Sequence, residues 1–90
     1  VAVQQPEKEA LVLSVAPNPA ETFIQVGVNS DESGTLRIVD VAGRLVFESQ
    51  TEAAASFLRI DVQTWPAGVY YALWASENGR SGKGRFTVMR

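Results

Sequence analysis

The chain has 90 residues, of which 46% are hydrophobic and 20% charged, with a formal net charge of −2. This length fits one domain with a single thin core. The charge balance argues against nucleic-acid binding, which needs a basic surface, and no apolar run approaches the ~20 residues of a membrane-spanning helix. Without any His or Cys, the chain lacks the usual serine triad, thiol nucleophiles and zinc-thiolate sites.

Residues 1–10 are predicted to form a linker to an upstream domain, because residues 4–9 are polar and show no apolar period. Since the chain begins with Val1 rather than Met, we expect it to be part of a longer protein. Pro6 suits the first position of a helix, so an extended tether and a short helical turn both stay open here. The folded domain is expected over residues 11–90.

Seven short segments show the period-two alternation of β-strands. They span residues 11–15, 22–28, 35–40, 44–48, 56–62, 69–76 and 81–89. Turn signals separate them, among them Asp40-Val41-Ala42-Gly43 and Asn78-Gly79. Residues 49–55 contain helix formers but are too few for a stable helix, so we predict a loop. Strands at this spacing, without a convincing helix, predict an all-β antiparallel sandwich of two sheets.

Most predicted strands have one apolar face. The residues expected to face inward are Leu11, Leu13, Val15, Ile24, Val26, Val28, Leu36, Ile38, Leu58, Ile60 and Val62. Residues 69–76 differ, because Tyr70, Ala72 and Trp74 make one apolar face and Val69, Tyr71 and Leu73 another. Only one face of a strand is buried in a sandwich, so either loops cover the second face or an aromatic patch is exposed.

Two corners are marked by proline. Pro17 and Pro19, on either side of Asn18, cannot donate ladder hydrogen bonds, which ends the first strand. Pro66 and Gly68 form a tight turn directly before Tyr70. Immunoglobulin-like sandwiches often place a tyrosine at such a corner, with its hydroxyl bonded to upstream backbone. We predict this role for Tyr70, with Trp65 packed beneath the corner.

No residue pattern indicates catalysis, a cofactor or a metal. Asp31-Glu32-Ser33 lacks the ligand ladder of a calcium loop and is predicted to be a solvated turn. Residues 79–84 do not follow the order of a phosphate-binding loop and are predicted to be a flexible hairpin. Basic residues gather towards the end of the chain: Arg80, Lys83, Arg85 and Arg90. They could protect an edge strand or act as an electrostatic handle for a receptor.

Four motifs follow one another in a distinctive order. They are Pro17-Asn18-Pro19-Ala20, Asp40-x-x-Gly43-Arg44-x-Val46, Ile60-Asp61-Val62 followed by Trp65-Pro66-Ala67-Gly68-Val69-Tyr70, and Lys83-x-x-Phe86-x-Val88-x-Arg90. In this order and spacing they resemble the type A C-terminal sorting domain of cargo proteins of the type IX (Por) secretion system of Bacteroidota. The resemblance covers residues 11–90. Two positions differ from the family pattern: Trp65 stands where a leucine is usual, and Trp74 stands where a small β-branched residue is common. We expect Trp74 to add exposed aromatic surface.

The resemblance implies a seven-stranded immunoglobulin-like sandwich that is a non-catalytic sorting signal. It would direct an upstream cargo domain from the periplasm through the outer membrane, to the cell surface or the medium. The implied partners are the translocon and a surface sortase, which commonly removes the domain and joins the cargo to lipopolysaccharide. The cut would fall in the linker, at Gln4, Gln5, Pro6, Glu7, Lys8, Glu9 or Ala10.

Individual residues take roles under the same resemblance. Recognition by the translocon would involve Lys83, Arg85, Phe86, Val88 and Arg90. Structural motif positions would be Pro17, Asn18, Pro19, Asp40, Gly43, Pro66, Gly68 and Tyr70. The alternative is a passive or carbohydrate-binding immunoglobulin-like module of an extracellular enzyme. In that case Trp65, Trp74 and Tyr71 would form an exposed platform for stacking against sugars.

Overall fold

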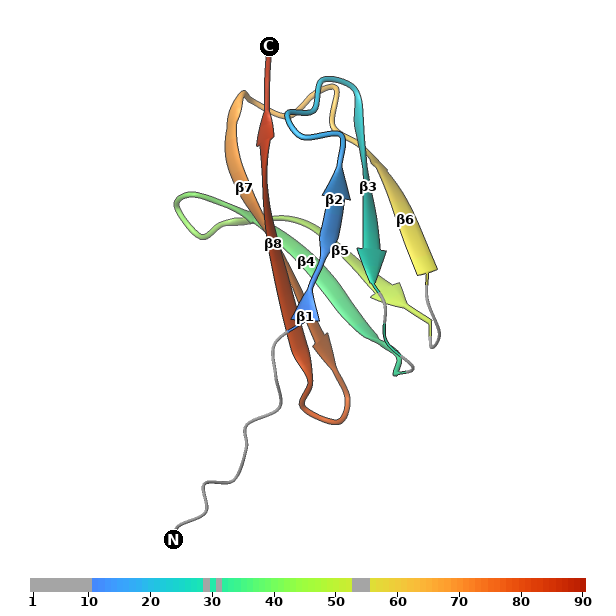
Figure 1. The fold of residues 1–90 in the computed structure, drawn as a ribbon. Helices are drawn as coiled ribbons and strands as arrows, with labels where there is room; N and C mark the ends of the chain where they lie inside the picture. The colour runs from blue at the N-terminus through green and yellow to red at the C-terminus, as the bar shows by residue number, and fades with distance from the viewer. Residues whose placement is uncertain (1–10, 29, 31, 53–55) are drawn as a thin grey trace, which may run out of the picture.

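The computed structural model describes residues 11–28, 30, 32–52 and 56–90. These residues form an immunoglobulin-like sandwich of two β-sheets, with no helix among them, which confirms the predicted fold class (Figure 1). The strands are β1 (Leu11–Val12), β2 (Ser14–Ala16), β3 (Phe23–Val28), β4 (Gly34–Asp40), β5 (Leu45–Thr51), β6 (Ser56–Asp61), β7 (Gly68–Ser76) and β8 (Ser81–Val88).

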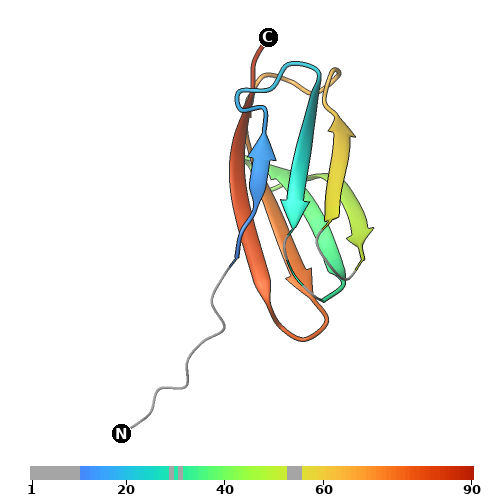
Figure 2. The same cartoon turned by 45° about the vertical axis from the view of Figure 1, so that its right-hand side comes forward.

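The two sheets differ in size. One has five strands in the order β1-β8-β7-β4-β5, and the other has three in the order β2-β3-β6. Figure 2 shows the three-stranded sheet lying in front of the larger one. Neighbouring strands are antiparallel except β1 and β8, which run parallel. The predicted linker, residues 1–10, lies outside the described residues.

The first predicted strand is divided between the two sheets. β1 pairs with β8, whereas β2 pairs with β3. Leu13 lies between them, is buried, and donates its N–H to the carbonyl oxygen of Lys83 at 3.1 Å. Gly84 permits the crossing, because a Cβ added there would lie 3.1 Å from the carbonyl oxygen of Leu13. One segment of chain thus closes one side of the sandwich.

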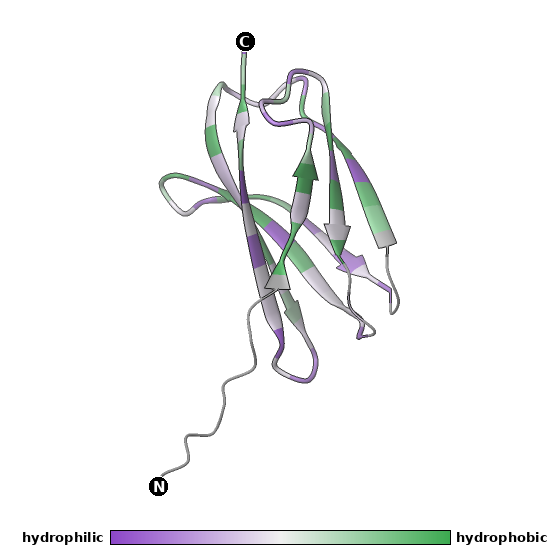
Figure 3. Ribbon diagram, viewed as in Figure 1, coloured by the Kyte–Doolittle hydropathy of each residue, from purple (hydrophilic) through white to green (hydrophobic). Residues whose placement is uncertain are grey.

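The core lies between the sheets and follows the predicted alternation. Its buried hydrophobic residues are Leu13, Ala20, Ile24, Val26, Val28, Leu36, Ile38, Ile60, Val62, Tyr70, Ala72, Trp74, Phe86 and Val88. Val15, Phe47, Leu58 and Trp65 pack against them while half-buried. Figure 3 shows the resulting change between apolar and polar residues along β3 and β4.

The loop predicted over residues 49–55 is partly wrong. β5 continues to Thr51, because Ser49, Gln50 and Thr51 pair with residues 34–36 of β4. Residues 53–55 lie outside the described residues. Tertiary pairing therefore overrides the local helix propensity of this segment.

The predicted turns at Asp40–Gly43 and Asn78-Gly79 are confirmed. Asp31, of the predicted turn Asp31-Glu32-Ser33, lies outside the described residues. The Asp40 carboxylate accepts hydrogen bonds from the N–H groups of Ala42 at 3.0 Å and Arg44 at 2.9 Å, and Gly43 has a φ of 84°. Gly79 has a φ of 91° in the hairpin between β7 and β8. Glycine suits both positions because it adopts positive φ without a steric penalty.

Candidate recognition site

The predicted tyrosine corner is present at the start of β7. The Tyr70 hydroxyl donates a hydrogen bond to the carbonyl oxygen of Pro66 at 2.6 Å. The ring of Trp65 lies 5.2 Å from that of Tyr70, and Phe86 stacks on Tyr70 at 5.5 Å between ring centroids. Burial and, to a smaller extent, the charge of Asp40 raise the pKa of Tyr70, while Arg90 opposes the rise. This aromatic group joins β7 to β8.

Arg90 fastens the end of β8 to two connecting segments. Its guanidinium donates to the carbonyl oxygen of Glu21 at 2.8 Å, and to that of Trp65 from Nε at 3.1 Å and from Nη2 at 2.7 Å. Nη2 also donates to the carbonyl oxygen of Val62. Glu21 lies between β2 and β3, and the other two lie between β6 and β7. A single side chain therefore ties three parts of the chain together.

The side chain of Asn18, between Pro17 and Pro19, bonds to the backbone of β8. Its Oδ1 accepts the N–H of Thr87 at 3.0 Å, and its Nδ2 donates to the carbonyl oxygen of Arg85 at 3.4 Å. Ala20 continues the pairing, since it donates to Thr87 at 2.8 Å and accepts from Met89 at 2.8 Å. The side chain of Asn18 thus replaces a strand neighbour where prolines cannot pair.

β8 is consequently not an edge strand, because other segments of the chain pair with it on both sides. β7 covers one side of β8. On the other side lie β1, Leu13, Asn18 and Ala20 in succession. Protection of an edge therefore does not explain the basic residues of β8.

The structure separates the four basic residues. Lys83 and Arg85 are exposed on the outer face of the larger sheet, whereas Arg80 is half-buried in the hairpin and Arg90 lies at the opposite end of β8. Neither Lys83 nor Arg85 makes an ion pair within the described part of the chain, in contrast to Arg37, which pairs with Glu48 at 3.0 Å. Two unpaired cations thus remain on one face.

Apolar residues lie directly beside these two cations. Lys83 is opposite Leu73, and Arg85 is opposite Tyr71. Leu73 and Tyr71 are each 39% exposed, so the described loops do not cover this face of β7 and the second expectation, an exposed patch, is confirmed. We call Tyr71, Leu73, Lys83 and Arg85 the β7–β8 face. The sequence shows the apolar side and the cations separately, and only the register between β7 and β8 brings them together.

Phe86 and Val88 occupy the opposite face of β8. They are 0% and 1% exposed, within the core. Their predicted part in recognition stays a prediction, but in the folded domain they lie out of reach of a partner. They hold β8 against the core, which positions Lys83 and Arg85 on the outside.

The proposed tryptophan platform is wrong. Trp74 is 1% exposed, and its indole N–H donates to the Thr51 hydroxyl at 2.8 Å. Its position follows from alternation with Tyr70, since both lie on the buried face of β7. Trp65 is half-buried against Tyr70. The expectation that Trp74 adds exposed aromatic surface is therefore also wrong.

The described residues contain no helix that is long and hydrophobic enough to cross a membrane. Within the same residues, no three His, Cys, Asp or Glu side chains gather as a metal ion would require.

Comparison with known families gives a match over most of the chain. Residues 14–88 match the family described as secretion system C-terminal sorting domain. The chain belongs to this family. The sorting domain is thus a type IX secretion signal, carried by an upstream cargo and implying export to the cell surface or the medium. Sorting domains of this family are in general non-catalytic. Comparison with curated proteins and with solved structures finds no match.

Proposed function

We propose that the export machinery recognises this sorting domain through the β7–β8 face. The supporting observation is the row of two unpaired cations opposite two exposed apolar side chains on β7. Aromatic side chains and arginine are enriched in protein interfaces, and exposed cations accelerate encounter with an acidic partner. The partner would thus present acidic groups beside an apolar surface.

The other predicted recognition residues support this face indirectly. Phe86 and Val88 anchor β8 in the core, and Arg90 fixes its end. Residues that touch the partner would be Lys83 and Arg85. Those that keep the strand in place would be Phe86, Val88 and Arg90.

The individual steps of export and processing are also proposals. The domain would pass through the periplasm and meet the translocon, and a surface sortase would then cut within residues 4–10. These residues directly precede β1, which pairs with β8 at Lys83. The cargo would then be joined to lipopolysaccharide. Exposed polar linkers are common sites of proteolysis.

The test joins residues 1–90 to an inert reporter in a host with a type IX system. We expect surface export with the unchanged domain and retention in the periplasm after the double change Lys83→Gln and Arg85→Gln. Arg37→Gln is the matched control, because Arg37 is exposed on the same sheet but already paired with Glu48. Thermal unfolding checks that all variants fold.

Two outcomes separate the parts of the proposal. Export of the double variant at the unchanged level would contradict the β7–β8 face as the recognition surface. Retention of the unchanged domain in the periplasm would contradict the export function of this chain. A reporter that is exported without a cut inside residues 4–10 would contradict the processing step alone.

A further inference from the structure

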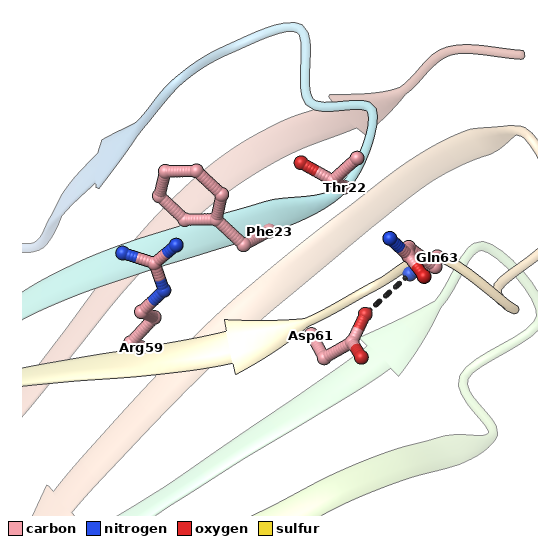
Figure 4. Close-up of a pocket in the computed structure, with 5 residues that line it drawn as sticks. All are labelled: Thr22, Phe23, Arg59, Asp61 and Gln63. Atoms are coloured by element: carbon pink, nitrogen blue, oxygen red, sulfur yellow. Dashed lines mark hydrogen bonds between the residues drawn. The ribbon is translucent and has the colours of Figure 1, made fainter.

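The outer face of the three-stranded sheet carries a group of side chains that the sorting function does not use. β6 places Phe57, Arg59 and Asp61 at alternate positions of this face, and Phe23 of β3 lies opposite Asp61. An open hollow of about 480 Å³ is lined by Thr22, Phe23, Arg59, Asp61 and Gln63 (Figure 4). We call these five residues and Phe57 the β3–β6 face.

Arg59 is held in position but not neutralised. Its guanidinium carbon lies 3.7 Å from the centroid of the Phe23 ring, an arrangement that fixes the guanidinium by cation–π attraction. Among the described residues, no hydrogen bond or ion pair occupies its N–H groups. A planar guanidinium with free edges receives a carboxylate through two parallel hydrogen bonds. The site is therefore prepared for a carboxylate group.

The opposite side of the hollow offers neutral and acidic hydrogen-bonding groups. The Asp61 Oδ1 accepts the backbone N–H of Gln63 at 2.9 Å, and Figure 4 shows the Thr22 hydroxyl and the Gln63 amide bordering the same space. A carboxylate, a hydroxyl and an amide together suit a ligand with several hydroxyl groups. β3 is paired on both sides, by β2 and β6, whereas β6 is an edge strand of this sheet. The free backbone groups of an edge strand point outward in the plane of the sheet, so a ligand that lies on the face meets side chains and not free backbone.

Phe57 extends the face beyond the hollow. It is 67% exposed, and its ring covers Gly27, where an added Cβ would lie 2.9 Å from the Phe57 Cε1. The glycine lets the ring lie against the sheet with its other side open. Two strand positions, roughly 7 Å, separate Phe57 from Arg59, a distance that neighbouring rings of an oligosaccharide can span.

We propose that the β3–β6 face binds an acidic oligosaccharide. The carboxylate of one sugar lies on Arg59, its hydroxyl groups bond to Asp61, Gln63 and Thr22, and a neighbouring sugar ring stacks on Phe57. The face lies on the sheet opposite to the β7–β8 face, so both can be occupied at once.

The test is an NMR titration of the 90-residue chain with digalacturonate, a disaccharide of two carboxylated sugars. We expect saturable shifts of the amide signals of Phe23, Arg59 and Gln63. Arg59→Gln weakens binding about tenfold, the effect of losing one charge-assisted contact of about 1.4 kcal/mol. Phe57→Ala also weakens it. Arg37→Gln, an exposed arginine on the other sheet, is the matched control and leaves the affinity unchanged.

Several results would overturn the proposal. They are the absence of saturable shifts, shifts confined to another face, or equal binding by the Arg59→Gln chain with a preserved, dispersed spectrum. Equal binding of acetate would reduce the site to a carboxylate contact, and equal binding of neutral galactobiose would remove the role of Arg59. Because the readout is binding in vitro, failure here leaves the export proposal untouched.

Discussion

The indole N–H of Trp74 donates a hydrogen bond to the hydroxyl of Thr51 at 2.8 Å, and both groups are buried. The bond joins β7 to β5 across β4, which lies between them. Gly34 of β4 leaves the space for it, because a Cβ there would lie 2.8 Å from the Trp74 Nε1. The contact thus couples three neighbouring strands at one end of the larger sheet.

Thr51→Val should destabilise the domain by about 1–3 kcal/mol, because it leaves a buried indole N–H without a partner. Urea unfolding measures the change. Thr35→Val is the control, since the Thr35 hydroxyl makes only an exposed contact to Gln50 at 3.4 Å. Equal losses in the two variants would contradict a special role of the Trp74 bond.

Gly34→Ala should cost about 1–3 kcal/mol through overpacking. The added Cβ would lie 2.3 Å from the carbonyl oxygen of Ala75, and neighbouring backbone cannot move aside cheaply. The free energy of unfolding in urea again provides the measurement. A variant as stable as the unchanged domain would show that β4 and β7 can separate locally without loss.

Arg90→Lys should lower stability by about 1–2 kcal/mol, because a lysine ammonium cannot reach three carbonyl oxygens in the geometry of a guanidinium. Thermal and urea unfolding test this. Arg85→Lys is the matched control, since Arg85 makes no ion pair within the described residues. If Arg90→Lys proves neutral, positive charge alone and not the three-carbonyl geometry holds the end of β8.

Asp40→Asn should change how stability depends on pH. The pKa of Asp40 is lowered mainly by the hydrogen bond from the backbone N–H of Arg44. Burial, the next largest influence, raises the pKa, but the Ala42 N–H and the charge of Arg44 lower it further. A lowered folded pKa gives stability that is present above the unfolded pKa and is lost as the pH falls through the folded pKa. The unchanged domain should therefore lose more stability than Asp40→Asn as the pH falls below about 4. Parallel urea-unfolding curves against pH would contradict this.

Tyr70→Phe should change how the stability of the domain depends on pH in alkaline solution. Burial raises the pKa of Tyr70 in the folded domain. The contribution of Tyr70 to stability is therefore fully present below the unfolded pKa and is lost as the pH rises through the folded pKa. The unchanged domain should thus lose stability above about pH 10 more steeply than Tyr70→Phe. At neutral pH the variant should be less stable by about 1 kcal/mol, because the bond to Pro66 is lost. Tyr71→Phe, at an exposed position, is the control.

Local chemistry made much of the fold predictable. The Asp40–Gly43 turn, the Tyr70 corner and the alternation along β3 and β4 depend on neighbouring residues, and all three are confirmed. The burial of Trp74 was also available from sequence, since it shares the alternation of Tyr70. We misjudged it by treating the two apolar faces of this strand as equivalent.

Contacts between distant residues could not be predicted. Asn18 and Thr87 are 69 positions apart, as are Arg90 and Glu21. Periodicity indicates which side of a strand is buried, but not which segment lies along its edge. The pairing of Tyr71 with Arg85, which defines half of the candidate site, likewise depends on strand register. It required the three-dimensional arrangement of β7 and β8.

The parallel course of β1 and β8 has a mechanical consequence. Residues 11–20 run along β8 from Gly82 to Val88 and bond to it repeatedly, through Leu13, Asn18 and Ala20. The chain thus enters the sandwich at one end of β8 and leaves it at the other (Figure 1). Traction between the cargo side and the end of β8 would load these bonds together in shear, not one after another. The domain should therefore resist unfolding when it is pulled between residue 11 and the end of β8.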